Sequence, residues 1–341
     1  MDRFLIERTL RDLRVGLHSS RVIAATALRR ATQGPKHPTW SYQFEVVHEV
    51  IRAVVALGFS GMSLELRRAM PIRALSARVR QVLDFQAGTI AGLPMEQHTP
   101  RAWQQGDLVW LHLHGGAYSM CSPATHRSLA VRLALRTGAR VILPEYRKAP
   151  EHPFPAAIDD VLASYRALLS YGVAPAQIVV GGDSAGGGLA LALAQRLRAL
   201  ALPQPRALVL LSPWVDLTAT GGTIEAHGPF DYLSGEMLAW GAANYLAGAD
   251  PRDPLVSPVF ADLSGLPPML VQSGGSEILL GQNVALVERA RAAGVQVHHE
   301  ISEGMVHVFH VYTGFPASRA AFESLARFVR SPSPNRASTS T

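Results

Sequence analysis

The sequence predicts an α/β fold, with a mostly parallel, twisted sheet and helices on both of its faces. From about Gly88 onward, short apolar runs alternate with helix-like stretches such as residues 156–169 and 188–200. The apolar runs cover residues 108–113, 140–143, 178–180, 207–211, 269–272 and 295–298. Continuous apolar strands separated by helices are typical of parallel strands buried on both faces. Because such sheets bind ligands at the carboxyl ends of their strands, we expect functional residues in the loops that follow these runs.

The composition permits a large core and argues against a nucleic-acid partner. Hydrophobic residues make up 48% of the 341 residues and charged residues 17%, which suits one α/β core with a smaller appendage. The formal net charge is +6, but the basic residues are spread along the whole chain. A nucleic-acid interface gathers them on one face. We therefore expect no nucleic-acid partner.

The single cysteine and the hydropathy pattern indicate where in the cell the protein is expected. Cys121 alone excludes an intrachain disulfide, and we expect it to act as a small buried hydrophobe rather than as a catalytic thiol. No apolar run reaches the about 18 residues that span a bilayer, and the N-terminus shows no clear signal-peptide pattern. We expect a cytoplasmic protein without stable membrane insertion.

Apolar periodicity divides the chain into core and cap segments. The first stretch has apolar residues at helical spacing and no strand pattern. Later, a Gly-rich piece and an aromatic helix with Tyr232, Met237 and Trp240 interrupt the alternation of strands and helices. The predicted segments are an N-terminal helical cap at 1–70, the first part of the core at 71–215, a second cap segment at 216–250, the second part of the core at 251–330, and a disordered tail at 331–341.

Ser184 is the candidate nucleophile. It lies in the pattern Gly-Asp-Ser-Ala-Gly at residues 182–186, between an apolar run and a helix-like stretch. This arrangement is typical of a nucleophile elbow, in which glycines let strand and helix pack closely around a strained serine. The helix N-terminus behind the serine favours developing negative charge. A phosphate-binding loop of the Walker type would require Gly-Lys-Ser/Thr, which is absent here.

A second Gly-rich turn, His-Gly-Gly-Ala-Tyr at residues 114–118, ends an apolar run. Backbone N–H groups converge on a tetrahedral intermediate only where side chains do not crowd them. We expect the N–H groups of Gly115, Gly116 and Ala185 to form an oxyanion hole. The alternative is that His112 and His114 bind a metal, but no Cys-rich or carboxylate-rich cluster accompanies them. No metal is expected, and His114 is expected to stabilise the loop through hydrogen bonds.

From about Leu108 to Phe309 the sequence resembles the hormone-sensitive-lipase-like (bacterial family IV) esterases of the α/β-hydrolase superfamily. The resemblance rests on His-Gly-Gly-Ala-Tyr at 114–118, Glu-Tyr-Arg-Lys-Ala-Pro-Glu-His-Pro-Phe-Pro-Ala at 145–156, Gly-Asp-Ser-Ala-Gly-Gly at 182–187 and Ser-Pro-Trp-Val-Asp at 212–216. It implies an α/β-hydrolase core, a helical cap built partly from the N-terminus, and hydrolysis of esters with short to medium acyl chains. It also suggests a homodimer.

Two positions depart from the pattern of this family. Ala117 stands where the family usually has the third glycine of His-Gly-Gly-Gly. The segment Gly-Gly-Ser-Glu-Ile-Leu-Leu-Gly at 274–281 offers one carboxylate, Glu277, where the family often has two aspartates.

His307 and Glu277 are the candidate base and acid. The order Ser, acid, His is that of this fold, and both residues follow predicted strands. An imidazole can take the serine proton near neutral pH, and a carboxylate orients the ring and stabilises the imidazolium. His310 is the alternative base, although the resemblance across residues 304–309 favours His307. Asp216 is the alternative acid, although its position in Ser-Pro-Trp-Val-Asp favours a role in fixing a loop.

These residues predict a serine carboxylester hydrolase that works through an acyl-enzyme and needs no cofactor. Its substrate would be a small ester, with lactones and acetylated metabolites compatible, and Tyr118, Tyr232 and Trp240 are expected to contact it. Amidase or acyltransferase chemistry on the same residues is an alternative. A non-catalytic receptor for a small ligand is another, although a candidate for every catalytic role is present.

Overall fold

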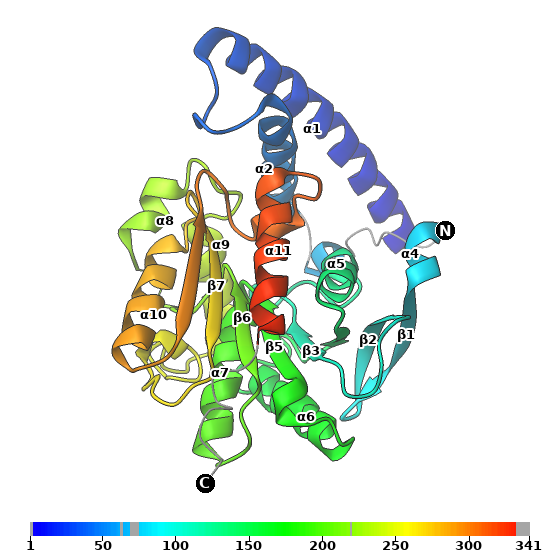
Figure 1. Cartoon of the computed structure of the whole chain (residues 1–341). Helices are drawn as coiled ribbons and strands as arrows, with labels where there is room; N and C mark the ends of the chain where they lie inside the picture. Colours follow the sequence, from blue (N-terminus) through cyan, green and yellow to red (C-terminus); the bar gives the residue numbers. More distant parts are fainter. Residues whose placement is uncertain (1–2, 62–63, 69–74, 219, 332–341) are drawn as a thin grey trace.

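The computed structural model describes residues 3–61, 64–68, 75–218 and 220–331 (Figure 1). The predicted disordered tail lies outside the described residues except for Ser331. Among the residues described, no helix combines the length and the hydropathy needed to cross a bilayer.

A single eight-stranded sheet forms the centre of the molecule. Its strands, in chain order, are β1 (Leu83–Ile90), β2 (Leu93–Pro100), β3 (Val109–Leu113), β4 (Arg140–Pro144), β5 (Ile178–Asp183), β6 (Ala207–Leu211), β7 (Met269–Gly274) and β8 (Val297–Ser302). In space the order is β1-β2-β4-β3-β5-β6-β7-β8. The strands β4, β3, β5, β6, β7 and β8 are parallel to one another, whereas β2 is antiparallel to both β1 and β4. The prediction of a mostly parallel sheet is confirmed.

Helices cover both faces of this sheet. The described helices of the core are α4 (Ala77–Val82), α5 (Arg127–Thr137), α6 (Ala156–Ser170), α7 (Ala185–Ala199), α10 (Leu280–Ala292) and α11 (Pro316–Arg330). Helices α5 and α11 pack against each other on one face (Figure 1). Helices α6, α7 and α10 lie on the other, where α7 contacts β3, β5 and β6.

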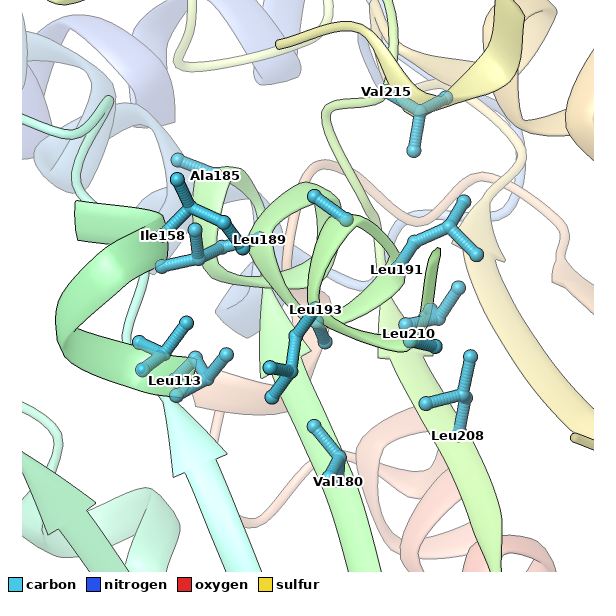
Figure 2. Close-up of a cluster of buried hydrophobic side chains, with 14 of the residues drawn as sticks. Leu113, Ile158, Val180, Ala185, Leu189, Leu191, Leu193, Leu208, Leu210 and Val215 are labelled. Atoms are coloured by element: carbon cyan, nitrogen blue, oxygen red, sulfur yellow. The ribbon is translucent and has the colours of Figure 1, made fainter. Parts of the chain in front are cut away.

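The central strands β3 to β7 are largely apolar because both of their faces are buried. Successive residues alternate between the two layers: Val180, Leu208 and Leu210 pack toward α7, whereas Val179 and Val209 pack toward α5 and α11. Figure 2 shows Leu189, Leu191 and Leu193 of α7 among the side chains of β5 and β6. This packing fixes the position of α7, and with it the turn that joins β5 to α7.

The antiparallel hairpin of β1 and β2 was not predicted from the sequence. Six of the eight residues of β1 are exposed, so the strand carries no alternating apolar pattern. Ala91 and Gly92 both have positive φ at the turn, which is the conformation of tight two-residue hairpins. Glycine, as at position 92, is common at positive φ, but alanine, as at position 91, is not. The sequence signal of this hairpin is therefore weak.

Helices from the N-terminus and from the 216–250 insertion lie beside the core. They are α1 (Arg3–Gln33), α2 (Tyr42–Gly61), α3 (Leu64–Arg68), α8 (Gly222–His227) and α9 (Gly235–Leu246). Helices α1 and α2 pack side by side at one end of the molecule (Figure 1).

The N-terminal helices are anchored to the loop that follows β8. Trp40 donates a hydrogen bond from Nε1 to the Gly304 carbonyl at 2.5 Å. In α2, His48 Nδ1 lies 2.8 Å from the Tyr312 hydroxyl and its Nε2 lies 2.6 Å from the Phe230 carbonyl oxygen. Since Phe230 belongs to the 216–250 segment, α2 ties this segment to the loop that carries the candidate base.

Candidate active site

Ser184 occupies the turn between β5 and α7 with a backbone conformation that serine rarely adopts. Its φ is 54° and its ψ is −124°, a strained region for a residue with a side chain. Backbone hydrogen bonds hold the turn, because Ser184 N donates to the Leu211 carbonyl at 2.9 Å and Trp214 N donates to the Ser184 carbonyl at 2.9 Å. The surrounding strands therefore enforce the strain.

The glycines that flank this turn are required by close backbone contacts. A β-carbon at Gly186 would lie 1.9 Å from the Leu113 carbonyl oxygen, and one at Gly182 would lie 2.2 Å from the Gly186 carbonyl oxygen. No side chain fits at such distances. The glycines bring the first turn of α7 against the end of β3, next to the Gly115–Gly116 turn.

The N–H groups expected to form the oxyanion hole have no acceptor among the residues that the structure describes. Gly116 has a φ of 118°, and Ala117 follows with a φ of 51°, so the third small position accepts a methyl group in a left-handed conformation. Within the described parts of the chain, the N–H groups of Gly115, Gly116 and Ala185 donate no hydrogen bond. A β-carbon at Gly115 would lie 3.1 Å from Ser184 Cβ, so the loop is adjacent to the serine.

His114 contacts the backbone of this loop. Its Nδ1 is 2.8 Å from the Gly115 carbonyl oxygen, and the Tyr146 hydroxyl donates to the His114 carbonyl at 2.6 Å. The Tyr146 ring stacks on the imidazole at 4.3 Å. The described residues include no group of three or more His, Cys, Asp or Glu side chains that could hold a metal ion.

His307 follows β8 and faces the same cavity as Ser184. Its side chain is buried, and neither ring nitrogen has a hydrogen-bond partner among the residues described here. Burial lowers the pKa of His307 to about 3, so the ring is neutral and has a lone pair for a proton. An imidazolium formed here would need a nearby carboxylate.

Glu277 is fully buried in the turn after β7, and three donors hold its carboxylate. Ser212 Oγ and Gly274 N donate to Oε2 at 2.5 and 2.9 Å, and Asn283 Nδ2 donates to Oε1 at 2.8 Å. Burial raises the pKa of Glu277 to about 8, against the effect of these hydrogen bonds. Glu277 and His307 are not hydrogen-bonded to each other, and catalytic hydrogen bonds often form only with substrate bound.

Two residues not identified from the sequence join the loops of Glu277 and His307. Ser212 accepts a hydrogen bond from Val308 N at 3.0 Å while it donates to Glu277. Asp231 accepts from Ile278 N at 2.9 Å through Oδ2 and from His307 N at 3.4 Å through Oδ1. Because Asp231 belongs to the 216–250 segment, sequence spacing gave no sign that it lies between these two loops.

The alternative base and acid make other contacts. His310 Nε2 lies 3.0 Å from Gln272 Oε1, so this nitrogen is engaged. Asp216 Oδ1 accepts hydrogen bonds from the Thr218 N–H at 2.9 Å and its hydroxyl at 2.6 Å. These contacts hold the turn after β6, as expected for a residue that fixes a loop.

A cavity of about 480 Å³ lies in front of Ser184 and His307. Apolar side chains from the N-terminal helices and from the insertion form one part of its wall. They include Ile51, Val54, Val55, Phe59, Tyr232, Leu233, Met237, Leu238 and Trp240. Two of the three expected substrate contacts, Tyr232 and Trp240, therefore line the cavity.

The expectation that Tyr118 contacts substrate needs correction. Tyr118 is 2% exposed and does not line the cavity. Its ring stacks on Tyr245 with centroids 3.8 Å apart. The left-handed backbone of Ala117 and Tyr118 turns this ring into the layer between α7 and α9, and the next small side chain, Ala117, lines the cavity instead.

Cys121 also lines the cavity, and its surroundings do not favour a nucleophilic thiolate. Burial raises the pKa of this thiol to about 11. A neutral thiol is a poor nucleophile at neutral pH.

Comparisons with known proteins identify close relatives. The profile of a family described as having the alpha/beta hydrolase fold matches residues 110–311. An acetyl-hydrolase of Streptomyces hygroscopicus is 43% identical over 232 residues, which cover 67% of this chain and 78% of that protein. An esterase of Acinetobacter venetianus is 44% identical over 223 residues, which cover 64% of this chain and 74% of the relative.

Solved structures extend the likeness to nearly the whole chain. The crystal structure of an esterase from the bacterial hormone-sensitive lipase family is 36% identical, with a TM-score of 0.72, and the match covers 92% of this chain and 97% of that one. A hormone-sensitive lipase from a metagenome library gives a TM-score of 0.75 at 34% identity, covering 83% of this chain and 97% of the other.

Proposed function

Because the chain belongs to the hormone-sensitive-lipase-like (bacterial family IV) carboxylesterases of the α/β-hydrolase fold, we propose that it hydrolyses short- to medium-chain acyl esters through an acyl-enzyme on Ser184. In this proposal His307 is the general base, Glu277 is the acid, and the N–H groups of Gly115, Gly116 and Ala185 form the oxyanion hole. The relatives are named as esterases and hydrolases, which favours an enzyme over a non-catalytic receptor.

The observation that carries the proposal is the strained serine facing a neutral imidazole across one cavity. Ser184 and His307 both line this cavity, and strand and helix packing enforce the backbone of Ser184. Strain of this kind persists only where the surrounding structure holds it, and it concentrates at functional sites. The N–H groups beside the serine, which have no acceptor among the described residues, support the proposal because an oxyanion requires such donors.

The reaction proceeds in two halves on these residues. His307 takes the proton of Ser184 as Oγ attacks the ester carbonyl carbon, and the resulting oxyanion accepts hydrogen bonds from the backbone N–H groups. The C–O bond to the alcohol then breaks, and His307 returns the proton to the departing alkoxide. Water, deprotonated by His307, attacks the acyl-enzyme in the same way and releases the acid.

Glu277 supports the charge that forms on His307 during each half. The three donors to its carboxyl group favour the ionised form, but burial outweighs them and raises its pKa to about 8. Ser212 and Asp231 connect the loop of this carboxylate to the loop of the base, which limits their relative movement. Orientation and charge stabilisation are thus the roles proposed for Glu277.

The size and character of the cavity support the proposed substrate class. A volume of about 480 Å³ suits a small apolar ligand, since ligand pockets typically occupy about 300–1,000 Å³. The aromatic and aliphatic wall from α2 and α9 favours burial of hydrocarbon. A short or medium acyl chain fits both features.

The first prediction concerns Ser184→Ala. Without the hydroxyl no acyl-enzyme forms, so we expect kcat for p-nitrophenyl butyrate to fall by about 10⁶-fold with the thermal unfolding midpoint little changed. Steady-state kinetics and circular dichroism measure both. A variant with near-normal turnover would eliminate the proposed nucleophile.

The second prediction compares the two candidate acids. Glu277→Ala should lower kcat/KM for the same ester by at least about 100-fold, because the base loses its carboxylate. Asp216→Ala is the matched control, and it should cost less than about tenfold because this carboxylate holds only its own turn. The reverse order of effects in folded variants would assign the acid to Asp216.

The third prediction tests chain-length preference. In a series of p-nitrophenyl esters from acetate to laurate, kcat/KM should peak at a short or medium chain and fall for the longest. Trp240→Ala removes an aromatic part of the cavity wall and should shift the peak to longer chains, whereas Tyr171→Ala, at a side chain 69% exposed, should not. An unchanged profile in Trp240→Ala would exclude this wall from acyl binding.

A further inference from the structure

Asp183, the residue before Ser184, is a buried carboxylate held between two imidazoles. His112 Nε2 lies 3.1 Å from Asp183 Oδ1, and His126 Nε2 lies 3.1 Å from Asp183 Oδ2. The side chains of Asp183 and His112 are 5% and 0% exposed, so little water screens this carboxylate. Neither Asp183 nor His126 has a role in the reaction described above.

The Asp183 carboxylate lies next to the oxyanion loop, the Gly115–Gly116 turn whose N–H groups are proposed to bind the oxyanion. A β-carbon at Gly115 would lie 2.4 Å from Asp183 Oδ2, which places that oxygen in contact with the loop. Both Asp183 and His126 also line the substrate cavity. An uncompensated negative charge here would oppose the oxyanion that forms on the substrate, since like charges repel strongly where water is excluded.

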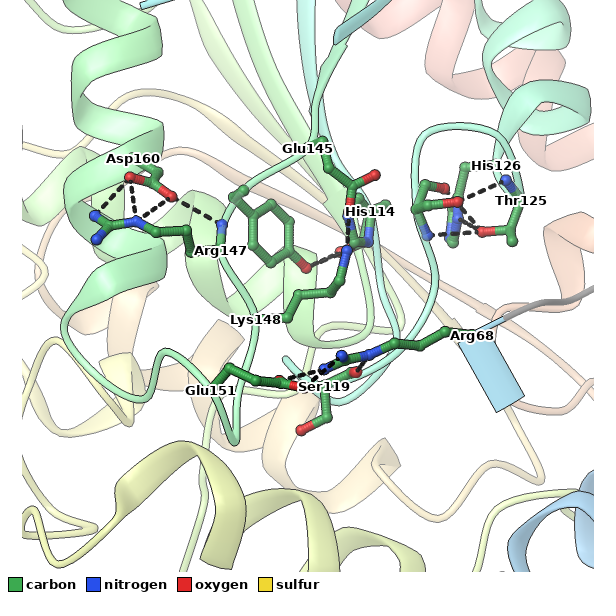
Figure 3. A network of polar contacts seen from close by, with 12 residues as sticks. Arg68, His114, Ser119, Thr125, His126, Glu145, Arg147, Lys148, Glu151 and Asp160 are labelled. Atoms are coloured by element: carbon green, nitrogen blue, oxygen red, sulfur yellow. Dashed lines mark hydrogen bonds and ion pairs between the residues drawn. The ribbon is translucent and has the colours of Figure 1, made fainter. Parts of the chain in front are cut away.

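The hydrogen bonds of His126 can be satisfied by protons on both ring nitrogens. Its Nε2 faces Asp183, and an ionised carboxylate can only accept. Its Nδ1 lies 3.0 Å from Thr125 Oγ1 (Figure 3). Thr125 uses its single hydroxyl proton to donate to the Ser122 carbonyl at 2.8 Å, so Thr125 Oγ1 accepts from His126. With the Thr125 proton on the Ser122 carbonyl, the ring that satisfies both contacts is an imidazolium.

The other titratable groups around His126 do not compensate Asp183. His112 donates from Nε2, its Nδ1 has no partner in the described chain, and burial lowers its pKa, so it is neutral. Burial also lowers the pKa of His114 well below its usual value, and the charge of His126 lowers it further. Lys148 is paired with Glu145, as Figure 3 shows.

The shifts of the two partners agree with this assignment. Burial opposes the charged form of His126, but the Asp183 carboxylate outweighs it and raises the pKa of His126 above 6.5. Burial likewise opposes ionisation of Asp183, yet His126 and His112 hold its pKa well below the ordinary range. Each ion exists because the other is present.

We propose that His126 is a positioning residue that acts through Asp183: as an imidazolium it cancels the carboxylate charge behind the oxyanion loop, so that the oxyanion can form there. The proposal rests on the proposed esterase function. It predicts that esterase activity falls when the His126 imidazolium loses a proton. Because the pKa of His126 is raised above 6.5, this fall occurs on the alkaline limb of the pH–activity profile.

The test compares single and double variants on p-nitrophenyl butyrate between pH 5 and 10. His126→Gln keeps a donor toward Asp183 but no charge, and it should lower kcat by about 10- to 100-fold, change KM less, and remove the alkaline limb of the profile. Adding Asp183→Asn to His126→Gln removes the uncompensated charge and should restore kcat at least about tenfold over His126→Gln. His98→Gln, at a buried histidine 3.5 Å from Glu96 on β2, is the matched control and should keep the alkaline limb.

The outcomes distinguish charge compensation by His126 from a purely structural role of this residue. A double variant as slow as His126→Gln, or slower, would overturn the proposal, because lost packing is not repaired by a second substitution. An unchanged alkaline limb in folded His126→Gln would do the same. If the variants do not fold, ¹⁵N NMR of histidine in the unaltered protein decides: two protonated ring nitrogens on His126 at pH 7 support the proposal, and one contradicts it.

These outcomes distinguish failure of this proposal from failure of the proposed function. Loss of turnover in Ser184→Ala together with no rescue in the double variant would leave the esterase mechanism standing and remove the role of His126. Turnover that survives in Ser184→Ala would remove the mechanism itself.

Discussion

The contact between the first turn of α7 and the end of β3 is the constraint on which the site depends. The backbones approach so closely that a β-carbon at Gly186 would lie 1.9 Å from the Leu113 carbonyl oxygen. This approach places the strained Ser184 and the N terminus of α7 beside the Gly115–Gly116 turn. Nucleophile and oxyanion donors are thus positioned by one packing contact, which the leucines of α7 secure against the sheet.

The same close packing buries several charged groups, and each has compensating partners. Glu277 has three donors and Asp231 accepts four backbone N–H groups, including those of Tyr232 and Leu233, while Asp183 has two imidazoles. Burial nevertheless raises the pKa of Asp231 to about 7 and that of Glu277 to about 8. Isolated buried charges are costly, so this concentration of carboxylates beside one cavity is typical of a functional site.

Much of the core and part of the site could be predicted from local sequence. The apolar runs located β3 to β7 because both faces of these strands are buried, and the glycines around Ser184 indicated the elbow because the turn excludes side chains. The exposed β1 escaped prediction because it has no apolar pattern. His126, Ser212 and Asp231 escaped it because their contacts join segments 47 to 96 residues apart, which spacing along the chain does not reveal. Tyr118 was assigned to the cavity from its place in a motif, but two successive positive φ angles turn it away.

The most direct test of the account is to identify the residue that an ester-like inhibitor modifies. A p-nitrophenyl alkylphosphonate should transfer one phosphonyl group to Ser184, with loss of esterase activity, and mass spectrometry should find it on the tryptic peptide of residues 167–196. Labelling should slow strongly in His307→Ala, because the hydroxyl then lacks its base. A phosphonyl group on any other residue, or complete labelling that leaves the esterase activity intact, would contradict the assignment of Ser184 as the nucleophile.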